Sequence, residues 1–141
     1  MGRTDNLRVQ HRELKALLGE VDGLLQQESL QQSSREVVEK LTRISGILLV
    51  HLSMEDKRLY PKLLDSPENS LRQMASVFIA EMGHIGETFT LYVDKWLHSS
   101  AIENNSEGFI GATKSLSAAL IERMKREDEV LYPEVDRLSE L

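Results

Sequence analysis

The chain has 141 residues, with 17 Lys and Arg against 23 Asp and Glu, a formal net charge of −6, four His and no Cys. A chain of this length can bury a sizeable core, so we expect a single domain over residues 1–141 that needs neither disulfides nor a metal merely to fold. The lack of Cys excludes disulfide scaffolds, thiolate zinc sites, iron–sulfur clusters and cysteine nucleophiles, so any metal must be held by nitrogen and oxygen.

Apolar residues recur at spacings of three and four along four long segments, which predicts four amphipathic helices. In chain order these cover about Thr4–Glu28, Ser34–Asp65, Pro67–Ser100 and the residues from Ser106 onward. We interpret the polar stretch Ser29–Ser34 as the first break, whose serines can cap the next helix. No segment alternates with period two for long enough to predict a strand. Because short connections make neighbouring helices antiparallel, the sequence predicts an all-α, up-down-up-down four-helix bundle.

The charge pattern and hydropathy argue against nucleic acid and membrane as partners. Nucleic-acid binding draws on clustered Lys and Arg, whereas the cations here are scattered among acids. The longest strictly aliphatic run is Ile47–Val50, far shorter than the roughly 20 residues of a spanning helix. The first residues match neither a secretory leader nor the myristoylation pattern. We therefore expect a cytoplasmic protein.

A short internal repeat links the second and fourth predicted helices. The segment Glu55–Pro61 reads EDKRLYP and the segment Glu127–Pro133 reads EDEVLYP, with five of seven positions identical at an offset of 72 residues. The two helices are therefore alike, as in a bundle with approximate two-fold symmetry. Each Pro falls late in its helix, where it should kink the last turns.

Several polar residues interrupt the apolar seams at one level of the predicted bundle. The height of each residue along its helix follows from its distance in sequence from the nearest break, at about 1.5 Å per residue. By this measure all four helices carry a polar group at a similar height, near the middle of the bundle. A single His on an apolar face is usually a core residue with hydrogen-bond partners, but a converging set of charged groups in a dry core needs compensation, and a metal would supply it. The residues of this layer are His11, His51, Glu55, Arg123 and Glu127, with His84 at the edge of its seam.

The chemistry of this layer favours a first-row metal. His51 and Glu55 are four residues apart, so both project from one face of a helix and can address one cation or a close pair. Imidazoles and carboxylates without sulfur suit iron or manganese, and zinc less well. His98 lies about 21 Å along the axis from His84, so we expect it at the surface. Tyr60 and Tyr132 are interpreted mainly as packing residues, with a hydrogen bond to a ligand as the alternative.

The sequence resembles the hemerythrin-like, or HHE cation-binding, domain. The resemblance rests on His51 and Glu55 followed by Leu-Tyr-Pro, on a His in the first and third helices, and on the repeated Glu-Asp-x-x-Leu-Tyr-Pro in the fourth. It covers essentially the whole chain and implies a hemerythrin-like bundle that holds non-haem iron, commonly an oxo-bridged pair. It also implies binding of dioxygen, or sensing of oxygen, nitric oxide, peroxide or iron. Carried over position by position, the implied metal ligands are His11, His51, Glu55, His84 and Glu127.

The chain departs from the pattern of this family at two positions. Alignment of the repeat places Arg123 opposite His51, where the family usually supplies another His, and Thr88 stands one turn after His84, where oxygen-carrying members have a further His. A guanidinium has only donors and cannot ligate, but its charge can be neutralised by a nearby Glu in place of a second cation. Three states follow: a dinuclear iron centre with waters filling the gaps, a mononuclear or labile site, and no physiological metal.

We therefore expect a non-haem iron protein that binds or senses a small diatomic or oxygen-derived ligand without being a dedicated enzyme. An oxidase or peroxidase that uses the same centre is one alternative. The other is a metal-free or metal-labile helical module for interaction or regulation, in which Arg123 replaces a metal ligand and forms a buried ion network with two Glu. The sequence identifies no protein partner and no oligomeric state.

Overall fold

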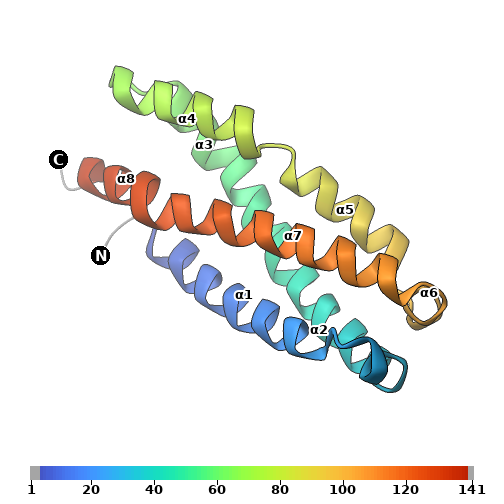
Figure 1. The fold of residues 1–141 in the computed structure, drawn as a ribbon. Helices are drawn as coiled ribbons and strands as arrows, with labels where there is room; N and C mark the ends of the chain where they lie inside the picture. Colours follow the sequence, from blue (N-terminus) through green and yellow to red (C-terminus); the bar gives the residue numbers. More distant parts are fainter. Residues whose placement is uncertain (1–3, 140–141) are drawn as a thin grey trace.

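A computed structural model describes residues 4–139 and shows them as helices packed into a bundle, which confirms the predicted all-α fold. Four long rods lie side by side and alternate in direction (Figure 1). The first rod is α1 (Asp5–Leu24), and the second joins α2 (Gln27–Met54), the π-helical turn η1 (Glu55–Leu59) and α3 (Tyr60–Leu64). The third consists of α4 (Asn69–Met82) and α5 (Ile85–Trp96), and α6 (Ser99–Asn104) follows it at one end. The fourth joins α7 (Ser106–Arg126), the π-helical turn η2 (Glu127–Leu131) and α8 (Tyr132–Ser139).

The predicted break at Ser29–Ser34 is wrong, because the chain is already helical there and reverses earlier, between α1 and α2. Tertiary contacts explain the difference. Leu30 is completely buried in the core, so its side chain belongs to the packed face of α2. Ser34 is also buried, and its hydroxyl donates to Glu103 Oε1 of α6 at 2.9 Å rather than capping a helix. The polar composition of the segment concealed its role in holding α2 against α6.

The predicted third helix is interrupted in its middle, between Met82 and Ile85. Glycine is unfavourable in a helix interior by about 1 kcal/mol relative to Ala, and Gly83 lies in the interruption while Gly86 follows just after it. An added Cβ at Gly83 would approach the carbonyl oxygen of Ile79 to 2.6 Å, so a side chain at this position would force the backbone to shift. The interruption therefore depends on local sequence, and it separates α4 from α5 at the level of the polar layer.

Both π-helical turns coincide with the copies of the internal repeat. Each begins at a Glu, Glu55 in η1 and Glu127 in η2, and each is followed directly by Tyr-Pro. A wider turn accommodates Pro inside a helical rod, since Pro has no N–H and its ring would press on the carbonyl four residues back. In a regular α-helix, residues five apart lie about 140° apart around the axis. The extra residue of the π turn brings Glu55 and Tyr60, and likewise Glu127 and Tyr132, into the bundle interior together.

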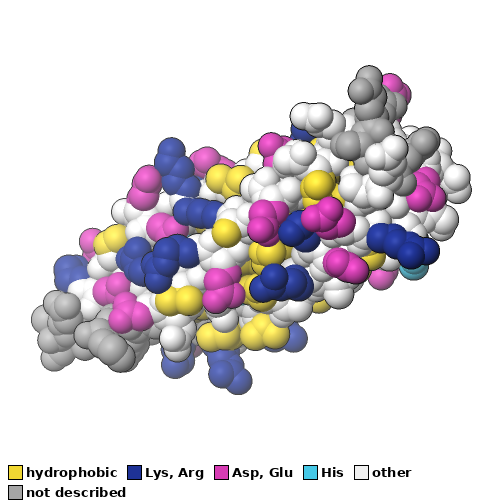
Figure 2. All heavy atoms as spheres, turned by 90° about the horizontal axis from the view of Figure 1, so that it is seen from below, with side chains coloured by type: hydrophobic (Ala, Val, Ile, Leu, Met, Phe, Trp, Pro, Cys, Tyr) yellow, Lys and Arg dark blue, Asp and Glu magenta, His cyan; other side chains and the backbone are white. Residues whose placement is uncertain are grey.

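The surface mixes both signs of charge. On the face shown in Figure 2, Lys and Arg alternate with Asp and Glu along the length of the bundle, and hydrophobic side chains lie between them in small groups. Among residues 4–139, no helix is sufficiently long and apolar to cross a bilayer.

Neighbouring leucines of α2 test this assignment of the core. Leu48 is 1% exposed and Leu49 is 42% exposed. Leu48→Ala should lower the free energy of unfolding by about 2–5 kcal/mol, because it leaves a cavity in a close-packed interior. Leu49→Ala removes the same atoms from the surface and should change it by about 0.5 kcal/mol. Urea unfolding of both variants measures the difference, and equal losses would contradict the packing described.

Candidate metal centre

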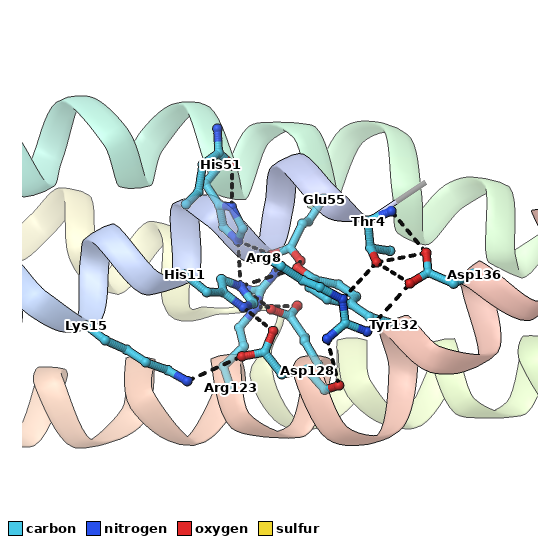
Figure 3. A network of polar contacts seen from close by, with 12 residues as sticks. Thr4, Arg8, His11, Lys15, His51, Glu55, Arg123, Asp128, Tyr132 and Asp136 are labelled. Carbon is cyan, nitrogen blue, oxygen red and sulfur yellow. Dashed lines mark hydrogen bonds and ion pairs between the residues drawn. The ribbon is translucent and has the colours of Figure 1, made fainter. Parts of the chain in front are cut away.

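Three of the four rods bring together four of the predicted ligands. His11 comes from α1, His51 from the end of α2, and Glu55 and Glu127 from the first positions of η1 and η2. One nitrogen or oxygen atom of each lies within 4.8 Å of those of the other three. All four side chains are at most 1% exposed. Figure 3 shows His11, His51 and Glu55 converging in the bundle interior, with Arg123 beside them.

The two imidazoles are oriented by the ring nitrogens that face away from the cluster. His11 Nδ1 lies 2.8 Å from Asp128 Oδ1, and His51 Nδ1 lies 2.7 Å from Gln10 Oε1. Both oxygens are acceptors, so each Nδ1 carries the hydrogen and each Nε2 presents its lone pair. The two Nε2 atoms are 2.9 Å apart. Two lone pairs at this distance repel, and either a proton or a metal cation removes the repulsion.

The two carboxylates are held crosswise by the tyrosines of the repeat. Tyr60 of the first copy donates to Glu127 Oε2 of the second at 2.6 Å, and Tyr132 of the second copy donates to Glu55 Oε2 of the first. The other oxygens face the imidazoles, Glu55 Oε1 at 3.1 Å from His51 Nε2 and Glu127 Oε1 at 3.3 Å from His11 Nε2. Among the residues that the structure describes, Glu127 Oε1 has no hydrogen-bond partner although it is fully buried.

Burial and the repulsion between like charges shift the pKa values of the cluster residues. Burial raises the pKa of Glu55 and of Glu127, and the charge of Glu55 raises the pKa of Glu127 further. Burial, together with the neighbouring charge of His11, lowers the pKa of His51 to about 4. Burial alone would lower the pKa of His11 too, but its contacts with Glu127 and Asp128 outweigh this and raise it. A proton therefore competes with a metal cation for His11 Nε2 more strongly than it would at an ordinary imidazole.

These residues fit a metal cation. A cation among them would replace the repulsion between the two Nε2 lone pairs with coordination and would give Glu127 Oε1 a partner. It would also offset the cost of burying two carboxylates. Two imidazoles and two carboxylates without sulfur form a donor set for iron, manganese or zinc.

Arg123 lies in the same layer, as predicted, and is 2% exposed. Its Nε contacts Glu127 Oε2 at 3.2 Å, and its Nη2 contacts Glu55 Oε1 at 3.2 Å and Asp56 Oδ1 at 2.8 Å. Its Nη1 donates to the carbonyl oxygen of Met82 at 3.2 Å. The guanidinium is therefore bound to both carboxylates of the cluster, and it contributes charge without a lone pair.

His84, the fifth predicted ligand, is not brought to the cluster. It is exposed, it precedes α5, and it lines an apolar groove between α5 and α7. The expectation that it reaches the polar layer assumed an unbroken third helix, whereas the interruption after Met82 changes the direction of the residues that follow. Thr88 is exposed as well, with its hydroxyl bound to the His84 carbonyl. His98 precedes α6 and is exposed, outside the layer as expected.

Most of the residues that support the cluster give little signal in the sequence. Asp128 follows Glu127 in the repeat and looks like a surface acid, and Gln10 has no signal beyond its place beside His11. Tyr60 and Tyr132 were expected mainly to pack, yet each is buried with its hydroxyl on a carboxylate. Their presence in both copies of the repeat was the available signal, because a packing residue does not need to recur at a fixed distance from a Glu.

Residues 3–135 match the family model described as the hemerythrin HHE cation binding domain. No curated protein and no solved structure matches the sequence.

The contact between Asp128 and His11 predicts a loss of metal affinity on mutation. Asp128→Asn removes the carboxylate that orients His11 and should weaken the binding of iron(II) or manganese(II) about 10–100-fold. Glu129→Gln removes the same charge from the next residue, which is exposed, and should leave the affinity unchanged. Competition with a chelator measures both, and equal losses would show that only long-range charge matters.

Metal affinity should also depend on pH. Because a proton competes with the metal for His11, whose pKa is raised, affinity should fall at least about tenfold per pH unit below that pKa, and more steeply where Glu55 and Glu127, whose pKa values are also raised, take up protons. The pKa of His51, lowered to about 4, adds a second competing proton only in strong acid. Chelator competition between about pH 5 and pH 8 tests this dependence. Constant affinity across the window would contradict a raised pKa of His11.

Proposed function

Because this chain belongs to the hemerythrin HHE cation-binding domain family, we propose that its buried cluster holds non-haem iron and binds or senses a small diatomic or oxygen-derived ligand. The observation that carries the proposal is the convergence of His11, His51, Glu55 and Glu127 in the interior of the bundle. Bound iron would supply the site at which dioxygen, nitric oxide or peroxide attaches.

The protein residues around the cluster favour a small ligand. The four side chains are almost completely buried, which excludes any ligand of more than a few atoms. Burial raises the pKa of Tyr60 and of Tyr132 far above neutrality, so both phenols stay protonated and keep donating to Glu127 and Glu55. Arg123 holds a positive charge next to both carboxylates. The chain thus fixes the carboxylates from several directions and excludes bulk water.

Asp128 and Gln10 perform the same task for the imidazoles. Each holds one Nδ1–H, which fixes both the tautomer and the ring orientation, so that Nε2 of His11 and Nε2 of His51 face the same point. A metal bound there would meet ligands already in position, and little conformational entropy would be lost on binding. This arrangement supports stable retention of a bound metal rather than turnover of a large substrate.

The second candidate function is a metal-free or metal-labile helical module for interaction or regulation. The ion contacts of Arg123 with Glu55, Asp56 and Glu127 favour it, because they already compensate much of the buried negative charge. The two candidates differ at Glu127 Oε1. The ion network leaves this oxygen without a hydrogen bond among the described residues, whereas bound iron would give it a partner.

Two His variants separate these candidates. Protein purified from iron-replete cells should contain iron and absorb in the charge-transfer region, and its absorption should change when dioxygen or nitric oxide is added. His51→Gln should abolish both the iron and the absorption, whereas His98→Gln replaces an exposed His outside the layer and should retain them.

Thermal unfolding provides an independent measurement. A ligand that binds only the folded state must raise the unfolding temperature, so iron should stabilise the wild type and the His98→Gln variant but not the His51→Gln variant. Wild-type protein that retains no iron, and whose unfolding temperature responds to neither iron nor a chelator, would overturn the metal proposal in favour of the metal-free module.

A further inference from the structure

The polar layer has two unequal halves. One half contains the imidazoles of His11 and His51, with Asp128 and Gln10 behind them. The other half lies toward the third and fourth rods and is occupied by the guanidinium of Arg123. The two buried carboxylates, Glu55 and Glu127, lie between the halves and contact both.

The internal repeat shows which ligands the second half lacks. Arg123 stands 72 residues after His51, the same offset that relates Glu127 to Glu55, so it occupies the position of a second imidazole. The remaining imidazole of that half would come from the third rod. There the chain is interrupted after Met82, and His84 is exposed. Both nitrogen ligands are therefore missing from the same half of the layer.

In the second half, the groups that face the missing imidazoles contact Arg123 instead. In the first half, Asp128 holds His11 of the first rod at 2.8 Å. Its counterpart in the repeat, Asp56, faces the third rod at Gly86, where the position of an added Cβ is 3.7 Å from Asp56 Oδ2. Gly86 offers no side chain, and Asp56 instead contacts Arg123 Nη2 at 2.8 Å. From the third rod, the Met82 carbonyl accepts from Arg123 Nη1.

The guanidinium thus makes the contacts that a second cation would make. It contacts Glu55 Oε1 and Glu127 Oε2, one oxygen of each carboxylate of the cluster, and it is buried with them. Its charge is permanent, because a guanidinium keeps its proton in proteins. A second metal ion in this half would be repelled by that charge and would find no nitrogen donor.

We propose that the cluster binds a single metal ion per chain and that the Arg123 guanidinium permanently takes the place of a second one. This inference rests on the proposed function, since it assumes that the cluster binds metal at all. It narrows that function to ligands that coordinate one metal ion rather than bridge two.

The stoichiometry of the wild-type protein is the first test. The protein is loaded anaerobically with excess iron(II) and, in parallel, manganese(II), desalted, and analysed for metal and protein content. One ion per chain is expected with either metal. Two ions per chain would overturn the role of Arg123 and leave the metal site intact, whereas no retained ion would overturn the proposed metal site itself.

Three variants test the role of Arg123 directly. Arg123→His restores a nitrogen ligand and removes the fixed charge, so metal content should rise above one ion per chain toward two. Arg123→Lys keeps the charge and should stay at one. Arg126→His adds a His to the same helix at a residue paired with Glu81 outside the cluster, and it should also stay at one.

Thermal unfolding of each metal-loaded variant shows whether it is folded. A folded Arg123→His variant with one ion per chain, like the wild type, would overturn the proposal. An equal rise in metal content in Arg123→His and Arg126→His would also overturn the proposal, because any added His would then explain the rise. If Arg123→His does not fold, the wild-type stoichiometry still decides between one ion and two.

Discussion

The compensation of two buried carboxylates is the constraint on which the centre of this bundle depends. Glu55 and Glu127 are completely buried, and an isolated carboxylate in an apolar interior costs several kcal/mol. Each accepts a hydrogen bond from a Tyr, contacts the guanidinium of Arg123 and faces an imidazole. Family membership points to a cation as the remaining partner, and so does Glu127 Oε1, which accepts no hydrogen bond from the residues that the structure describes.

The internal repeat supplies the framework that makes this compensation possible. In each copy, Pro is accommodated by a π-helical turn, and this turn brings the Glu at its start and the Tyr five residues later to the bundle interior. Because the copies face one another, each Tyr reaches the Glu of the other copy. The symmetric framework then carries two different side chains, since Asp128 holds the imidazole of His11 while Asp56 holds the guanidinium of Arg123.

Much of the fold and most of the cluster could be predicted from the sequence because periodicity encodes both. Apolar spacing defined the four rods, and the residues that interrupt it identified His11, His51, Glu55, Arg123 and Glu127 as one layer. These predictions succeeded where each helix continues without interruption up to its polar residue. The break predicted at Ser29–Ser34 was wrong, because polar composition suggested a loop where Leu30 and Ser34 pack against the rest of the bundle.

The sequence by itself determined which residues lie at the level of the cluster, since height along a regular helix follows from counting. Only the tertiary structure decided which of them face it. The interruption beside Gly83 turns His84 to the surface, and no count of residues reveals the direction of a chain after a break. The partners of the ligands, Gln10, Asp128, Tyr60 and Tyr132, also depended on how the rods pack. Hydrogen bonds between separate helices are set by packing, which local spacing does not encode.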